Sequence, residues 1–135
     1  MYEIKKGSDK IAVKLGTDDI KDGLNFFTED DDFIQVGGWR YPEGKKLLAH
    51  KHEHVPRQIM HTQEIVFVVR GGLRAFIYDD DDAFLEELVL APGEAIILFR
   101  GGHGYEVTEN DTVVLEVKNG PYPGAEIDRR RLDVK

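Results

Sequence analysis

The stretch EIVFVVRGGLRAFIY, residues 64–78, contains two short apolar segments joined by the pair Gly71-Gly72. Both segments are rich in β-branched and aromatic residues, which favour strands over helices. Two glycines between such segments are typical of a turn. We therefore expect strands over residues 64–70 and 73–78, joined by a tight turn.

The same pattern continues on both sides of this pair of strands. Short apolar segments punctuated by Gly, Pro and Asp predict further strands over residues 11–15, 24–28, 33–41, 46–52, 84–90, 95–99, 105–108 and 112–117. The acidic runs 29–32 and 79–82 are interpreted as solvated turns. No segment has sustained helical periodicity. Many short strands predict an all-β antiparallel sandwich or barrel in a single domain over residues 1–135.

Three histidines at every second position, His50, His52 and His54, precede the strand expected at 64–70. Residues two apart lie on one face of a strand, so this run would present its imidazoles together. Glu64 opens the next strand, and His103 follows a later one, flanked by glycines that let the backbone turn sharply. Imidazole and carboxylate ligands suit a divalent transition metal such as Fe, Mn, Ni, Zn or Cu.

The spacing of these residues resembles the first sequence motif of the cupin family. The glycine, the histidine pair, the glutamate and the final glycine of that motif correspond to Gly44, His50, His52, Glu64 and Gly71. The spacer of residues 53–63 is longer than in the family, which indicates an extra loop.

The second cupin motif matches more loosely. Pro92-Gly93-Glu94 and Gly101-Gly102-His103 correspond to its glycine and histidine elements, whereas its proline after the strand and its closing asparagine are missing. The resemblance covers about residues 41–117. It implies a double-stranded β-helix, also called a jelly roll, with a metal near the axis of a small barrel.

The metal ligands that the resemblance implies are His50, His52, Glu64 and His103. His54 has the same strand parity and is the substitute candidate, whereas His61 falls in the extra loop and has no counterpart in the motif. Three histidines and one glutamate would leave two open positions on an octahedral ion, as a catalytic site needs. The alternative is a cupin that uses its histidines as acid–base groups and binds no metal.

Residues 57–64, 101–105 and 116–122 are similar to small single-domain cupins associated with polysaccharide and nucleotide-sugar biosynthesis. This likeness implies an isomerase- or epimerase-like proton transfer on a sugar, sugar derivative or small polyol, with the metal stabilising an enediolate. Tyr105 and Arg57 are the candidate catalytic residues, supported by Gln63. An Fe(II)-dependent dioxygenase and a non-enzymatic metal- or sugar-binding module are the alternatives.

Charge and composition exclude several classes of protein. A net charge of −8 argues against a nucleic-acid partner, and the basic run 129–131 is interpreted as a solvated or subunit-contacting tail. The absence of cysteine excludes disulfides and thiolate metal sites. With no apolar run long enough to span a membrane and no signal-like start, we expect a cytoplasmic protein. We also expect a small-molecule ligand and a homodimer, whose interface could include Phe26, Phe27 or Trp39.

Overall fold

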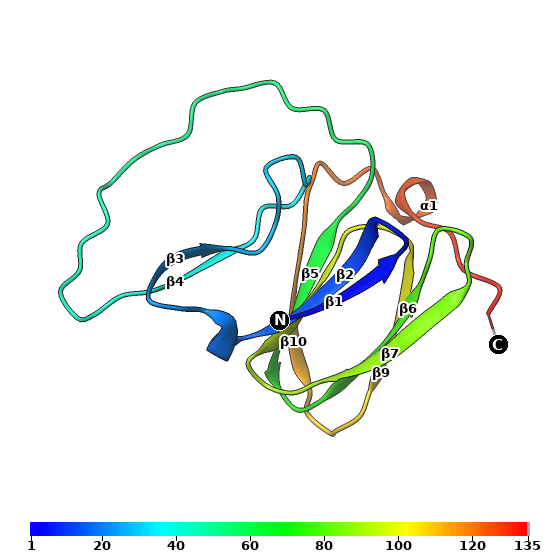
Figure 1. The fold of residues 1–135 in the computed structure, drawn as a ribbon. Helices are drawn as coiled ribbons and strands as arrows, with labels where there is room; N and C mark the ends of the chain where they lie inside the picture. The colour runs from blue at the N-terminus through cyan, green and yellow to red at the C-terminus, as the bar shows by residue number, and fades with distance from the viewer. Residues whose placement is uncertain (135) are drawn as a thin grey trace.

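The structure is a computed structural model that describes residues 1–134. Ten strands dominate it, and the named strands pair in antiparallel fashion (Figure 1). In chain order the elements are β1 (Tyr2–Lys6), β2 (Asp9–Gly16), the 3-10 helix η1 (Thr17–Asp19), β3 (Gly23–Phe26), β4 (Gly37–Arg40), β5 (Glu64–Arg70), β6 (Leu73–Tyr78), β7 (Phe84–Leu90), β8 (Glu94–Leu98), β9 (Gly102–Val107), β10 (Val113–Lys118) and α1 (Ala125–Asp128).

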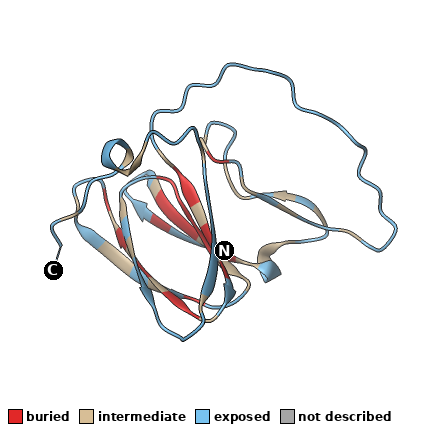
Figure 2. Cartoon of the chain, turned by 180° about the vertical axis from the view of Figure 1, so that it is seen from behind, coloured by how far each residue is buried: buried red, intermediate tan, exposed pale blue. Residues whose placement is uncertain are grey.

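Two of the three sheets pack face to face. The larger sheet has the strand order β1-β2-β8-β5-β10, and the smaller one has the order β7-β6-β9. One cluster of buried side chains joins them, with Val66 and Ile96 from the larger sheet and Ala75 and Ile77 from the smaller. Figure 2 shows these buried residues concentrated on the facing strands. Burial of this apolar surface is the main force that holds the two layers together.

A second cluster lies on the outer face of the larger sheet. Successive side chains of a strand point to opposite faces, so Ile96 enters the first cluster while Ile97 enters the second. Ile34 and Phe27, from the connection between β3 and β4, cover Ile97 there. This packing attaches the two-stranded β3–β4 sheet to the body of the molecule.

The all-β prediction is confirmed, as are the strands at 64–70, 73–78 and 84–90. The predicted strand 33–41 is reduced to Gly37–Arg40, and β1 was not predicted. Two facing antiparallel sheets are compatible with a jelly roll, but the described residues form no closed barrel. No helix within residues 1–134 is long and apolar enough to cross a membrane.

The predicted strand at 46–52 is wrong for the single chain. Residues 42–60, which we call the arm, contain no strand, and every one of them is exposed. Figures 1 and 2 show the arm as a wide loop on the side of β3 and β4. A strand needs a hydrogen-bonding neighbour, and none of the described strands lies beside the arm.

Candidate active site

Glu64 is the centre of a group of polar side chains at one end of the two facing sheets. As the first residue of β5 it shares the inner face with Val66 and Val68, and it is only 6% exposed. Its Oε1 atom lies 2.9 Å from Nε2 of His103 and accepts a hydrogen bond of 3.2 Å from the Tyr105 hydroxyl. A buried carboxylate is therefore satisfied by groups from the opposite sheet.

His103 and Tyr105 face Glu64 because of the register of β9. In the smaller sheet they pair with Ile77 and Ala75, two fully buried residues of the inner face. Directly paired residues of antiparallel strands lie on the same face of the sheet, so both polar side chains are directed inward.

Gly101 and Gly102 permit the tight backbone turn that leads into β9. Gly101 has a φ of +75°, and a side chain there would collide with the carbonyl oxygen of Tyr78. A side chain at Gly102 would collide with Leu132, whereas Gly104 has open space around it. The expectation that glycines permit a close approach of the backbone is thus confirmed at the first two positions.

Lys118 adds a positive charge to this group. It is the direct register partner of Glu64 on β10, and its Nζ atom lies 3.7 Å from the second carboxylate oxygen, Oε2. A closer contact of 2.6 Å joins Nζ to Glu116. The hydrogen bond with Glu116 raises the pKa of Lys118, so the amine stays charged at neutral pH.

The environment of Glu64 and Tyr105 sets their protonation states. Burial opposes ionisation of Glu64, but the hydrogen bond and charge of His103, helped by Lys118 and Tyr105, outweigh it and lower the Glu64 pKa. Burial, followed by the negative charge of Glu64, raises the pKa of Tyr105 well above its ordinary value. Glu64 is therefore an ionised acceptor and Tyr105 a protonated donor.

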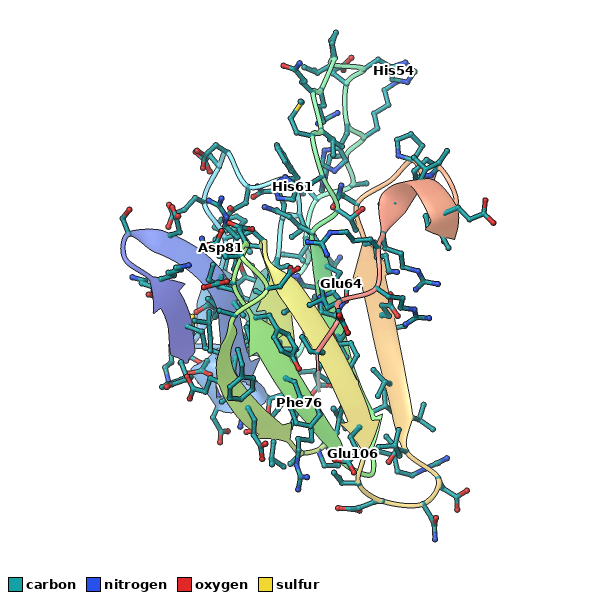
Figure 3. The ribbon with its side chains drawn as sticks, turned by 90° about the vertical axis from the view of Figure 1, so that its right-hand side faces the viewer. His54, His61, Glu64, Phe76, Asp81 and Glu106 are labelled. Carbon is teal, nitrogen blue, oxygen red and sulfur yellow. The ribbon has the colours of Figure 1, made fainter. Side chains whose placement is uncertain are left out.

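An open cleft of about 810 Å³ lies over these residues. Glu64, His103, Tyr105 and Lys118 line it from three strands, and the C-terminal segment forms its mouth. In Figure 3, Glu64 lies in the opening between β9 and β10. Its basic lining residues are Arg100, Lys118, Arg129, Arg130 and Arg131.

The arm histidines are not part of this group. His50 and His52 are exposed, with ring centroids 5.2 Å apart, and the Nδ1 atom of His50 lies 3.1 Å from the nearby Leu48 carbonyl oxygen. Figure 3 shows His54 far along the arm from Glu64. Of the four expected metal ligands, the structure brings together Glu64 and His103.

Two other expected site residues lie outside the cleft. Arg57 is exposed on the arm and bonds to the carbonyl of Val55. Gln63 is buried, and its side chain accepts a hydrogen bond of 2.9 Å from the Ile34 backbone. Gln63 therefore supports the fold, and a catalytic role for Arg57 stays a prediction.

Sequence reasoning missed three contributors to the cleft. Lys118 could have been found only from the register of β10 against β5. His61 lines the cleft and places its Nε2 atom 2.9 Å from the Phe99 carbonyl oxygen. The basic run 129–131, interpreted as a tail, lies at the mouth of the cleft.

The ligands that one chain offers do not make up the expected metal centre. Among residues 1–134 no group of three or more His, Asp or Glu lies close enough together to hold an ion. Glu64 and His103 are two side chains that could ligate a metal, and they already contact each other.

Comparison with known protein families, with curated proteins and with solved structures gives no match to this chain.

Proposed function

We propose that the cleft over Glu64 is the active site of an enzyme that moves a proton between carbon atoms of a small anionic polyol or sugar derivative. The observation that supports this proposal is the arrangement at Glu64: an ionised, buried carboxylate holds an imidazole and a phenol at an open cleft. Isomerisation and epimerisation both consist of such a transfer next to a carbonyl group.

His103 is the proposed proton carrier. Because ionised Glu64 is an acceptor only, the neighbouring Nε2 atom of His103 must carry the hydrogen. In the neutral ring the unprotonated nitrogen is then Nδ1, which has no hydrogen-bond partner among the described residues. Nδ1 takes the proton from a carbon next to the substrate carbonyl and returns it to the same or the adjacent carbon.

Tyr105 and Lys118 stabilise the enediolate that forms between the two proton transfers. The electrons left by the departing proton move onto the carbonyl oxygen, which becomes negative. Tyr105 remains protonated and can donate to that oxygen in place of Glu64, and Lys118 places a positive charge nearby. Fixed donors and charges of this kind are the largest source of stabilisation in many enzymes.

The mouth of the cleft favours an anionic substrate. Arg100 and Arg130 are paired with Asp80 and Asp82, but no ion pair involves Arg129 or Arg131 among the described residues. In a chain of net charge −8 the guanidinium groups of Arg129 and Arg131 are suited to a phosphate or carboxylate. The acidic residues of the same lining are Glu64, Asp80, Glu116 and Asp128. The cleft volume is in the range of small-molecule sites.

Solvent deuterium incorporation tests the proposal. The protein would be incubated in heavy water with glucose 6-phosphate or fructose 6-phosphate, and with glucose or fructose as neutral counterparts. We expect deuterium next to the carbonyl of a phosphorylated sugar, and a loss of about 100-fold in Glu64→Gln. Glu86→Gln, which changes a glutamate of β7 outside the cleft, serves as the matched control.

Two results would contradict the proposal. Saturable binding of the sugar phosphates without deuterium incorporation would identify a binding module instead of an enzyme. Equal incorporation by the wild type and Glu64→Gln would remove Glu64 from the reaction.

A further inference from the structure

The cleft is lined by a second histidine, His61, which comes from the other sheet. His103 lies on β9 of the smaller sheet, whereas His61 lies just before Glu64, the first residue of β5 in the larger sheet. Its ring contacts Phe99, which directly follows β8 of that larger sheet. Figure 3 shows His61 above Glu64, on the side toward the arm. The two imidazoles therefore border the cleft from its two sides.

The ring of His61 is held in place although the residue is exposed. Its Nε2 atom lies 2.9 Å from the Phe99 carbonyl oxygen, and its ring packs edge-on against Phe33 with a centroid distance of 4.9 Å. Asn119 donates a hydrogen bond of 3.3 Å to the His61 carbonyl and accepts one of 2.6 Å from the Gln63 amide. Support of this kind, from three other segments of the chain, is what a catalytic side chain needs.

These contacts leave one ring nitrogen of His61 free. A carbonyl oxygen only accepts hydrogen bonds, so the Nε2 atom of His61 carries the hydrogen. In the neutral ring Nδ1 is then unprotonated, and it has no hydrogen-bond partner among the described residues. His103 has the same arrangement, because its Nε2 atom contacts Glu64. Each side of the cleft thus offers one imidazole nitrogen that can take or give a proton.

The other polar residues of the cleft are less suited to carry a proton to and from carbon. Tyr105 lies two residues after His103 on β9 and therefore faces the cleft from the same side. Burial and the charge of Glu64 also raise its pKa, so it keeps its proton. Lys118 lies on the larger sheet, but its Nζ atom is 2.6 Å from Glu116, and this hydrogen bond raises its pKa.

Two proton carriers on opposite sides of a carbon atom can invert its configuration. Loss of a proton next to a carbonyl gives a planar enediolate. A single carrier returns the proton to the face from which it came, or moves it to the adjacent carbon. Inversion at the same carbon needs a second group that delivers a proton to the opposite face.

We propose that His61 is a second proton carrier and that the cleft catalyses an epimerisation. This inference rests on the proposed function of the cleft, and it selects one of the two reactions considered there. It also gives a catalytic role to a histidine that has no counterpart in the cupin motif.

The proposed reaction balances without a further reactant. Nδ1 of His103 takes the proton from the carbon next to the carbonyl, and the electron pair of the broken C–H bond moves onto the carbonyl oxygen. His61, protonated beforehand from water, gives the proton on its Nδ1 atom to the opposite face of the same carbon, and the C=O bond re-forms. His103 then returns its proton to water. The two histidines exchange roles in the reverse direction.

Glucose 6-phosphate and mannose 6-phosphate, which differ only at the carbon next to the carbonyl, test this inference in heavy water. The wild type should interconvert them and label both. Because His103 is expected to act on glucose 6-phosphate, His61 should act on mannose 6-phosphate. His61→Gln keeps a donor for the Phe99 carbonyl but carries no proton to carbon. It should lose about 100-fold in interconversion and in labelling of mannose 6-phosphate, and still label glucose 6-phosphate.

His103→Gln is the matched variant from the other side of the cleft. It should lose about 100-fold in interconversion and in labelling of glucose 6-phosphate, and still label mannose 6-phosphate. A merely structural role of His61 would not produce this opposite selectivity. The labelling that each variant retains also shows that the variant is folded.

Three results would overturn the inference. A wild type that labels glucose 6-phosphate without forming mannose 6-phosphate would keep the proposed function but remove the second carrier. A His61→Gln variant that treats the two sugars alike would do the same. A wild type that labels neither sugar would overturn the proposed function, and this inference with it.

Discussion

The Oε1 atom of Glu64 lies 2.9 Å from the Nε2 atom of His103, and this contact joins β5 of one sheet to β9 of the other. The two strands meet at the end of the molecule where no strand covers the gap between the sheets. A buried carboxylate at an open edge is costly unless it is satisfied by partners or serves a ligand.

The first prediction concerns the hydroxyl group of Tyr105. Tyr105→Phe keeps the ring but removes the donor to Glu64 and to the proposed enediolate, so deuterium incorporation should fall by roughly 100-fold. Tyr2→Phe is the matched control, because that hydroxyl also bonds to a glutamate, Glu86, but outside the cleft. A comparable loss in both variants would contradict a specific role for Tyr105.

The second prediction compares two glycines of the His103 turn. Gly101→Ala forces a side chain onto a φ of +75° and into the Tyr78 carbonyl, and should destabilise the protein by about 1–3 kcal/mol. Gly104→Ala meets no atom and should change the free energy of unfolding by less than about 0.5 kcal/mol. Denaturant unfolding measures both, and equal effects would contradict the described turn.

The third prediction concerns pH and Asp79. A 2.6 Å ion pair with Lys6, followed by the backbone amides of Ala83 and Asp81, lowers the Asp79 pKa despite its burial. A lowered pKa in the folded state means that the carboxylate stabilises the fold above its unfolded value, about 3.9, and loses that effect as the pH falls.

Asp79→Asn should therefore unfold more easily than the wild type at about pH 7, and the difference should shrink toward about pH 2. Asp81→Asn is the control, because Asp81 also contacts Lys6 but its side chain is exposed, so a smaller effect is expected. A difference for Asp79→Asn that is the same at both pH values would show that its charge is not the cause.

The fourth prediction tests the two buried clusters. Ile96→Ala and Ile97→Ala each truncate a fully buried side chain, and the two side chains lie on opposite faces of β8. Each substitution should lower the free energy of unfolding by about 2–5 kcal/mol. Val89→Ala on β7, where the side chain is 55% exposed, should cost less than about 1 kcal/mol. A small cost for Ile97→Ala alone would contradict the packing of the β3–β4 connection on the outer face.

The sequence predicts the parts of the fold that depend on local pattern. Strands such as β5 and β6 are short segments rich in β-branched and aromatic residues on either side of Gly71-Gly72, so their bounds follow from the sequence. The resemblance to the cupin motifs places Glu64 and His103 in one site, and the structure brings these two residues together. In these cases the local pattern and the tertiary environment agree.

The arm and Asp79 depend on partners that the sequence does not reveal. An alternating run such as His50–His54 indicates which side chains would share a face, but not which sheet edge the segment joins. Asp79 is interpreted from the sequence as part of a solvated turn, yet it is buried and forms an ion pair with Lys6 of the unpredicted strand β1. The structure of the arm and the burial of Asp79 both depend on contacts between residues that are far apart in the sequence.

Deuterium incorporation by a His103 variant tests the central claim most directly, that the imidazole held by Glu64 moves the proton. In heavy water the wild type should label glucose 6-phosphate or fructose 6-phosphate next to the carbonyl group. His103→Gln should lose about 100-fold of that rate, whereas Glu86→Gln, outside the cleft, should keep it. A wild type that incorporates no deuterium, or a His103→Gln variant that keeps the wild-type rate, would contradict the account.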